Sequence, residues 1–423
     1  MKLSSILPRL ACIAALFVFI SSCSENLDSS GVCDVLCPKI GGDVKTDIID
    51  AVTLDTTVQS VSGLGTEPAL LLANRGDTLD TRVVIRFDSL LKRFTPQGDS
   101  MQNIKSVDSA YILLRLDTLS IKGSDPVTIE AYDVDTTAND TSTAAVLALF
   151  RPDRFISSQT YARSELTDSL KYFISNDTLL AKIQNGERLR IGLRATGISS
   201  SQLTFASTEG GLQGGFAPVL FFRATPDTAT HPLTVAPFSA TPANESLIAR
   251  HLADYTIIAK APPNAPPSVL AVGGMPARRV YAKFDIPSKY IDSSTVVRAT
   301  LLLNQIPNPS LDPGDTIRVV PTVVLAGKAV IDPSKAAQII ANISVDTLRI
   351  TAGHGGSVDV ELAGAFSLWR TQQPDTLPRA IVLKSAFEGV SPIELRFSSS
   401  EDIAALRPRL RISYTTRVPL GLP

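Results

Sequence analysis

The stretch RVVIRFD at residues 82–88 recurs as RVYAKFD at residues 279–285, with Phe87 and Phe284 separated by 197 positions (284 − 87). In both stretches apolar side chains occupy every second position, and Arg or Lys takes two of the four remaining positions. Strands with one buried face have this period of two, so each stretch is predicted to be a β-strand. Because an arginine stem covers apolar area while its charge stays in water, we expect the arginines of these strands on a solvated sheet face.

Further blocks match in the same order along the chain, at separations of 190 to 199 positions. An ordered series of matches at a similar spacing indicates an internal duplication. The matching pairs are Asp55–Val58 with Asp254–Ile257, Leu72-Ala73 with Leu270-Ala271, SAYILLRL (109–116) with VRATLLL (297–303), LTFASTEG (203–210) with LRFSSSED (395–402), and APVLFF (217–222) with RPRLRIS (407–413).

Short alternating strands separated by turn-rich gaps are typical of antiparallel sandwiches. The predicted fold class is therefore all-β: two tandem jelly-roll-like antiparallel β-sandwiches with short helices, preceded by a lipoprotein signal peptide. Helices are expected at 164–186 and 360–372, where apolar residues have helical spacing. The predicted boundaries are a signal peptide at 1–22, a lipidated flexible tether at 23–43, domains at 44–223 and 247–417, a Pro/Thr-rich linker at 224–246 and a C-terminal tail at 418–423.

The N-terminus carries the features of a lipoprotein signal. Lys2 and Arg9 precede the apolar run ACIAALFVFI at 11–20, which is too short for a conventional membrane span. The string Ile20-Ser21-Ser22-Cys23 resembles a bacterial lipobox, in which the cysteine thiolate accepts the diacylglycerol. Several acyl chains on Cys23 would hold the protein at a bilayer. A plain secretory signal with a chance cysteine is the alternative.

The residue after the lipidated cysteine is Ser24, where Gram-negative lipoproteins retained at the inner membrane often have Asp. Ser24 therefore favours an outer-membrane location in a bacterial cell envelope. Two cysteines remain in the mature chain, Cys33 and Cys37. In an oxidising envelope a local disulfide between them is expected, with two free thiols as the alternative.

Composition excludes several classes of partner and site. Lys plus Arg number 40 and Asp plus Glu number 41, so the chain has no basic field of the kind that binds nucleic acid. The three histidines, His231, His251 and His354, are far apart in the sequence. They supply little material for a metal site or a Ser-His-Asp centre, so neither a metal ligand nor a catalytic residue is assigned.

The repeats resemble DNRLRE-type domains, a β-sandwich family of bacterial and archaeal surface proteins related to carbohydrate-binding modules. The resemblance lies in RVYAKFD (279–285), VVRATLLL (296–303) and the segment 357–385, with Trp369 at that family's aromatic position. The first copy departs from the pattern, because LKYFIS (170–175) stands where the tryptophan would be. The resemblance implies a binding or structural module, sometimes for polysaccharide. No cofactor is expected.

Aromatic residues make up 6 % of the chain, and no sugar-stacking platform can be identified from sequence. Trp369 is expected to pack its helix onto the sandwich. Carboxylate pairs could in principle hydrolyse glycosides, but turn chemistry explains most acidic residues. The loop DVDTTAND (133–140) has an oxygen-rich spacing that suits structural calcium, although turn formation explains it better.

The favoured hypothesis is a non-catalytic envelope lipoprotein that binds or scaffolds at the cell surface, with a polysaccharide or an envelope protein as partner. The first alternative is a surface glycan hydrolase, which requires carboxylates that converge in a cleft with raised pKa values. The second is a purely structural spacer. The ligand-binding residues are not assigned by the sequence.

Overall fold

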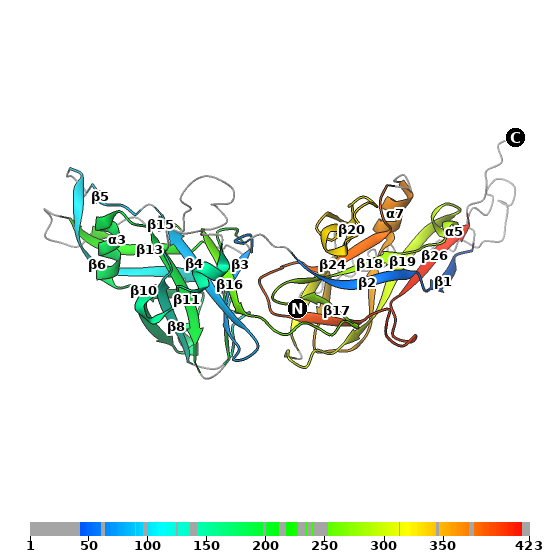
Figure 1. The fold of residues 1–423 in the computed structure, drawn as a ribbon, viewed down its shortest axis with the longest axis horizontal. Coiled ribbons are helices and arrows are strands. Elements are labelled where there is room, and N and C mark those ends of the chain that lie inside the picture. Colours follow the sequence, from blue (N-terminus) through cyan, green and yellow to red (C-terminus); the bar gives the residue numbers. More distant parts are fainter. Residues whose placement is uncertain are drawn as a thin grey trace, which may run out of the picture.

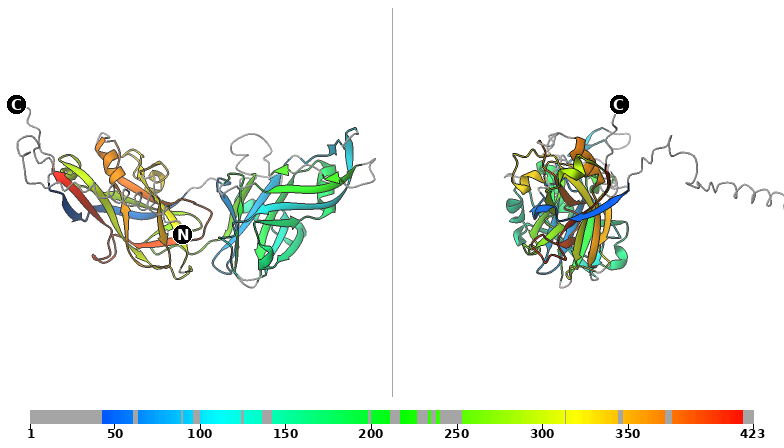
Figure 2. Two further views of the ribbon diagram at one scale, coloured as in Figure 1. Left: turned by 180° about the vertical axis from the view of Figure 1, so that it is seen from behind. Right: turned by 90° about the vertical axis from the view of Figure 1, so that its right-hand side faces the viewer.

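The computed structural model describes residues 43–416, except 61–63, 89, 96–99, 124–125, 136–141, 198–199, 211–216, 227–232, 235–237, 240–252, 313, 344–346 and 372–375. The predicted signal peptide, the lipidation site Cys23, the pair Cys33 and Cys37, and the tail 418–423 lie outside these residues. The described part of the chain forms two β-rich bodies that lie side by side along the long axis (Figures 1 and 2).

The first body packs two antiparallel sheets against each other. One has the strand order β7-β12-β3-β4-β11-β8-β9 with β16 also on β4, and the other has the order β10-β6-β13-β14 with β15 on β13 and β5 on β6. The strands are β3 (Ala69–Asn74), β4 (Asp80–Phe87), β5 (Arg93–Phe94), β6 (Gln102–Arg115), β7 (Lys122–Gly123), β8 (Val127–Asp133), β9 (Phe155–Tyr161), β10 (Ser169–Phe173), β11 (Leu189–Thr196), β12 (Ser201–Ala206), β13 (Val219–Pro226), β14 (Leu233–Thr234), β15 (Phe238–Ser239) and β16 (Asp254–Lys260).

The second body is a continuous antiparallel sheet folded over its own core, in the order β1-β26-β19-β25-β17-β18-β24-β20-β21, with β2 on β18, β22 on β20 and β23 on β19. The strands are β1 (Lys45–Ile49), β2 (Val52–Gln59), β17 (Val269–Gly273), β18 (Arg278–Phe284), β19 (Ser294–Ile306), β20 (Thr316–Val324), β21 (Ile340–Asn342), β22 (Leu348–Thr351), β23 (Gly356–Glu361), β24 (Ala380–Ser385), β25 (Glu394–Ser398) and β26 (Arg409–Thr416).

Each body has its own hydrophobic core, built from the inward side of alternating strands. Val83, Ile85 and Phe87 of β4 are buried in the first core, and Val280, Ala282 and Phe284 of β18 are buried in the second. The all-β fold class is confirmed. Each matched sequence block overlaps a strand, and β4 corresponds to β18 as the repeat predicts.

The helices are short and few among the described residues. They are α2 (Thr143–Leu147), α3 (Asn176–Asn185), α5 (Ser288–Ile291), α6 (Pro333–Ala336), α7 (Ala363–Thr371) and the single-turn segments η2 (Pro152–Arg154) and η3 (Arg163–Glu165). The helix expected at 360–372 is confirmed by α7, in which Trp369 packs against Phe284 and Phe366 with ring centroids 5.9 and 5.4 Å apart.

The helix expected at 164–186 is wrong over its first half, because residues 169–173 form strand β10 and the α-helix covers residues 176–185. Leu170 and Tyr172 are buried while Lys171 and Phe173 are exposed, so the segment has a period of two. The apolar run Tyr172–Ile174 fitted both periods, which is the common ambiguity of short apolar segments. Pairing with the long strand β6 settles it as a strand.

The two bodies exchange their equivalent first strands. Strand β2 belongs to the first repeat but pairs with β18 of the second body, and β16 belongs to the second repeat but pairs with β4 of the first body. Figure 1 shows β2 among the strands of the second body and β16 beside β3 and β4. The exchange is reciprocal, so each body is completed by a strand from the other repeat.

The register of the exchange is the same in both bodies. Asp55 lies opposite Ala282 on β18, and Asp254 lies opposite Ile85 on β4. Ala282 and Ile85 are equivalent positions, because both precede the repeated phenylalanine by two residues. The two exchanged strands therefore pair with equivalent strands, β18 and β4, in the same register, as expected for a duplicated sequence.

Each exchanged strand separates the two strands of a hairpin. Strands β17 and β18 pair only at their turn, through Gly273 and Arg278. In the space between them, the Thr57 hydroxyl of β2 accepts a 2.9 Å hydrogen bond from the Ala271 backbone N–H of β17. In the first body the Leu71 N–H of β3 donates a 3.0 Å hydrogen bond to the Thr256 hydroxyl of β16. A β-branched hydroxyl thus supplies the partner that a neighbouring strand would normally supply.

The same pair of side-chain contacts occurs on both exchanged strands. The Asp55 carboxylate accepts hydrogen bonds from Ser400, at 2.7 Å from the backbone N–H and 2.5 Å from the hydroxyl. Asp254 accepts the same two kinds of bond from Thr208, at 2.9 Å each. Ser400 and Thr208 are equivalent in the repeat, 192 positions apart (400 − 208). The aspartate of each exchanged strand therefore fixes a loop of the body that accepts it.

Three of the arginines expected on a solvated sheet face are buried, whereas others, such as Arg82 and Arg411, are partly exposed. Arg86 is 2 % exposed, Arg190 is 0 % exposed and Arg279 is 8 % exposed. The reason is that α2 covers this face of the first body, and α6 covers it in the second, over small apolar clusters that include Ile257 and Val58 of the exchanged strands. The charges are paired internally, for example by two bonds of 2.6 and 2.7 Å from Arg279 to Glu388.

The strand pairing also differs from the predicted domain boundaries. Residues 45–59, predicted in the first domain, complete the second body, and residues 254–260, predicted in the second domain, complete the first. Within the predicted linker 224–246, strand β13 continues to Pro226, and residues 233–234 and 238–239 pair with it. Matching repeats show which segments are equivalent, but not in which body an equivalent strand lies.

Cross-linking will test the exchange. Leu54 lies opposite Lys283, and both are exposed. Directly paired antiparallel residues are within disulfide reach, so Leu54→Cys with Lys283→Cys, in a chain with its four native cysteines replaced by serine, should form an intramolecular disulfide. Leu54→Cys with Arg86→Cys is the matched pair for the unexchanged register and should remain reduced. A disulfide in the second pair, detected by mass spectrometry, would show that β2 lies on its own repeat.

Candidate functional site

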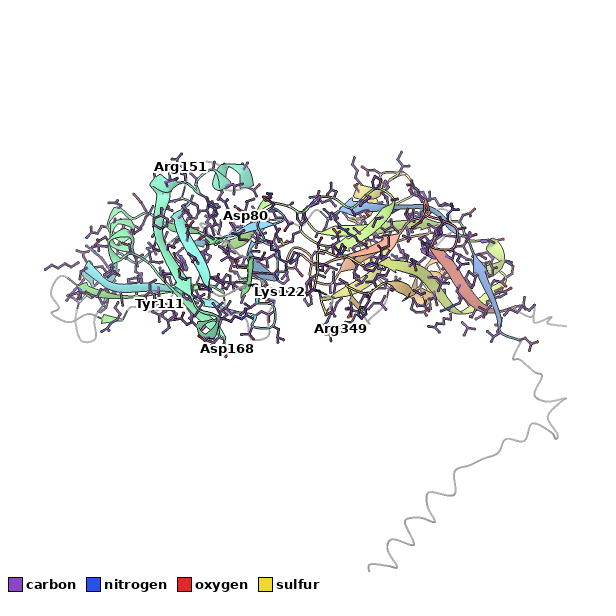
Figure 3. All side chains as sticks on the ribbon, turned by 90° about the horizontal axis from the view of Figure 1, so that it is seen from below. Asp80, Tyr111, Lys122, Arg151, Asp168 and Arg349 are labelled. Carbon is purple, nitrogen blue, oxygen red and sulfur yellow. The ribbon has the colours of Figure 1, made fainter. Side chains whose placement is uncertain are left out.

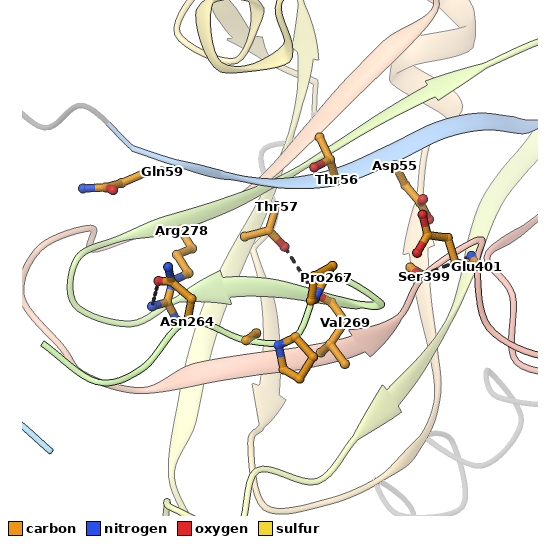
Figure 4. Close-up of a pocket in the computed structure, with 12 residues that line it drawn as sticks. Asp55, Thr56, Thr57, Gln59, Asn264, Pro267, Val269, Arg278, Ser399 and Glu401 are labelled. Atoms are coloured by element: carbon orange, nitrogen blue, oxygen red, sulfur yellow. Dashed lines mark hydrogen bonds between the residues drawn. The ribbon is translucent and has the colours of Figure 1, made fainter.

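A polar groove lies over the exchanged strand β2 in the second body (Figure 4). Its volume is about 450 Å³. Its walls come from β2, from the Pro-rich crossover that follows β16, from the start of β18 and from the loop after β25, so both repeats contribute to it. The lining residues are Asp55, Thr56, Thr57, Gln59, Asn264, Ala265, Pro266, Pro267, Val269, Arg278, Ser399 and Glu401.

One wall of this groove is held by a buried group of charges. Arg278, which is 5 % exposed, forms an ion pair with Glu394 and donates a 2.8 Å hydrogen bond to the Asn264 side-chain oxygen. Arg396 shares the Glu394 carboxylate at 3.0 Å. Burial lowers the pKa of Arg278, and the neighbouring Arg396 charge lowers it further. Removing Glu394 would leave two cations without their carboxylate. The three charged side chains therefore hold the wall of the groove in place and are not available to a ligand.

Three other side chains that line the groove are free to bind a ligand. The side chains of Thr56, Gln59 and Glu401 make no hydrogen bond to another described residue, and Gln59 and Glu401 are exposed. The Asn264 amide keeps its N–H donors while its oxygen is bonded to Arg278. These groups suit the hydroxyls of a polar ligand, because together they provide both donors and acceptors.

The carboxylates of the groove are not arranged as an acid–base pair. Asp55 is occupied by the two bonds from Ser400, and its hydrogen bonds hold the loop that carries Glu401. Asp254, in the first body, is an acidic side chain with a raised pKa, since burial raises it to about 7. Asp254 is 1 % exposed and does not line the groove. The convergence of carboxylates that a hydrolase requires is therefore not present in this groove.

Other acidic residues singled out by sequence are also paired. In the loop at 133–140, Lys182 contacts Asp133 at 3.0 Å and Arg188 contacts Asp135 at 2.6 Å. Cations thus pair with two of the carboxylates that were considered for calcium, and the third, Asp140, lies outside the described residues. In the described part of the chain, no group of three or more His, Cys, Asp or Glu side chains is placed to hold a metal ion.

A row of aromatic side chains crosses the outer face of the first body, and sequence reasoning missed it. Phe173 of β10, Tyr111 of β6 and Phe221 of β13 are direct cross-strand partners. The Tyr111 and Phe221 rings stack on each other at 5.3 Å, and Lys171 Nζ lies 5.2 Å from the Tyr111 ring centre. The Tyr111 and Phe221 ring faces pack against each other and, for Tyr111, against a lysine, so they do not present a flat surface on which a sugar could stack. The row was not recognised because Phe173 was assigned to a helix.

Comparisons with known proteins add little. No family model matches the chain, and no curated protein matches it. Among solved structures, a tandem CBM22 pair from Paenibacillus barcinonensis Xyn10C is 8 % identical, with a TM-score of 0.15 over 87 % of this chain and all of that one. The C-terminal domain of the Streptococcus pyogenes antigen I/II-family protein AspA is 11 % identical, with a TM-score of 0.14 over 87 % of this chain and 92 % of that one. Similarity this low supports no inference about fold or function.

Among the described residues, no helix has the length and apolar character needed to cross a bilayer.

Proposed function

We propose that this chain is a non-catalytic lipoprotein of the bacterial cell envelope, with two strand-exchanged β-sandwich modules of DNRLRE-like type that bind or scaffold at the cell surface. The observation that carries the binding role is the groove over β2, where the buried charges are committed to structure and Thr56, Gln59, Asn264 and Glu401 remain available. A polysaccharide is the favoured ligand, because its hydroxyls both donate and accept.

The anchor follows from the lipobox at Ile20–Cys23, with Ser24 favouring the outer membrane and a local disulfide between Cys33 and Cys37 in the tether. From Cys23 the tether would reach Lys45, the first residue of β1. Because β1 and β2 complete the second body, the tether joins the second body and not the first. The first body is then attached to the anchor only through the second body, although most of its residues precede those of the second body in the sequence.

Processing in cells will test the anchor. Expressed in a Gram-negative host, the chain should fractionate with membranes, and globomycin should cause a larger precursor to accumulate. Cys23→Ser should abolish both the processing and the membrane association, with Cys33→Ser as the matched control that leaves them unchanged. Normal maturation in the presence of globomycin, or release of the Cys33→Ser variant, would contradict the lipoprotein assignment.

A further inference from the structure

A second polar cavity lies between the two bodies. It has a volume of about 510 Å³. Arg75, Lys122, Ser201 and Gln202 line it from the first body, and Ser310 and Asp312 line it from the second. Figure 3 places Lys122 at the junction of the bodies. Residues of both bodies therefore form this inter-body cleft.

The charges of the inter-body cleft are unequally paired. Lys122 contacts both Asp312, at 3.2 Å, and the buried Asp315. No hydrogen bond or ion pair joins the Arg75 guanidinium to another described residue, although Arg75 is half-buried and also lines the smaller cavity beside Glu394 and Arg396. Burial lowers the pKa of Arg75, and the charge of Asp312 opposes this effect. Lys122 contacts both aspartates, so the Arg75 guanidinium is left without a hydrogen-bonded carboxylate and has Asp312 only as a nearby charge.

Two polar atoms in the same wall also lack partners. Ser201 and Gln202 are each 4 % exposed, and neither the Ser201 hydroxyl nor the Gln202 side-chain oxygen has a hydrogen-bond partner among the described residues. A buried polar atom without a partner costs about 1–3 kcal/mol, so such atoms indicate a missing donor or acceptor. A bound molecule with an oxyanion and hydroxyl groups would satisfy Arg75 and both atoms together.

We infer that the inter-body cleft binds an acidic saccharide, with one carboxylate on Arg75 and sugar hydroxyls on Ser201 and Gln202. Guanidinium pairs with a carboxylate through two parallel hydrogen bonds, which selects an oxyanion over a neutral group. Ser310 supplies a further hydroxyl from the second body, so the ligand would contact both bodies. The inference rests on the proposed binding function and names a ligand class and a site separate from the groove over β2.

Calorimetry on the mature full-length chain will test this site, with polygalacturonate as the probe and its fully methyl-esterified form as the neutral control. Polygalacturonate should bind, and the ester should bind at least tenfold more weakly. Arg75→Gln should weaken polygalacturonate binding by about tenfold to a hundredfold, the loss of one charged hydrogen-bonded pair. Arg349→Gln, which removes the same charge from an exposed strand of the second body, should leave binding unchanged.

Several results would overturn the site. The first is equal affinity for polygalacturonate and its methyl ester, and the second is an Arg75→Gln variant with the affinity of the parent chain. The third is inorganic phosphate that displaces the polymer at the same concentration of negative charge as the polymer itself. If binding survives Arg75→Gln but is lost in Gln59→Ala with Asn264→Ala, the groove over β2 binds the glycan and only the cleft assignment fails. If the parent chain binds neither polymer, the cleft assignment fails, and a glycan array then decides whether the proposed binding function also fails.

Discussion

Replacing Tyr255 by alanine should destabilise the first body by about 3–5 kcal/mol, although Tyr255 belongs to the second repeat. Tyr255 is 0 % exposed and packs against Val84 and Val146 beneath helix α2. Its hydroxyl accepts a hydrogen bond from Arg190, which is also fully buried. The alanine variant therefore loses a large buried ring and leaves an arginine without that partner, and both losses fall on the body formed by the first repeat.

Hydrogen exchange read by mass spectrometry can locate this effect. Peptides from β4 and β11 should lose protection in Tyr255→Ala, while peptides from β18 and β24 keep most of theirs. Thr56→Ala is the matched control, since Thr56 is the equivalent position of β2 and is only partly buried. It should change stability by less than about 1 kcal/mol. Loss of protection confined to the second body would show that β16 remains with its own repeat.

The repeat allowed the fold class to be predicted because period-two burial is a local property. Val83, Ile85 and Phe87 point into the core whichever strand lies beside them. The neighbours of a strand are not a local property. Asp55 and Asp254 belong to matching blocks, and that match holds equally well for a strand that stays with its repeat and for one that crosses to the other body.

The same limit explains which residues of the sites were missed. Arg75 belongs to a turn between β3 and β4 that is unremarkable in sequence, and its lack of a partner appears only once the second body is placed beside it. Arg278 stands one position before the repeated stretch 279–285, outside the alternation from which the outer face was predicted, and Glu394 and Asn264, 116 and 14 positions away, enclose it. Long-range pairing of charges leaves no periodic signal in a single sequence.

Raising the pH from about 4 to about 7 should weaken the first body, because Asp254 is held in its protonated form. Burial is the main cause of its pKa near 7, against an ordinary value of 3.8, with the charges of Glu209 and Glu67 adding to it and the bonds from Thr208 opposing it. Between these two values the folded chain binds a proton that the unfolded chain has released. The free energy of unfolding therefore falls as the pH rises through this window, by about 1.4 kcal/mol per unit and about 4 kcal/mol in all.

Denaturant unfolding of the parent chain and of Asp254→Asn, followed at several pH values, tests this expectation. Asparagine carries no charge at any pH, so the free energy of unfolding of the variant should change less between pH 4 and 7. Asp77→Asn is the matched control: its exposed carboxylate is bonded to Lys260, which holds its pKa below the ordinary value, so it is ionised throughout the window. Parallel curves for the parent and Asp254→Asn would contradict the assignment. A reduced slope would mean that β16 is held most firmly in acid, since its terminal aspartate is the group that loses a proton as the pH rises.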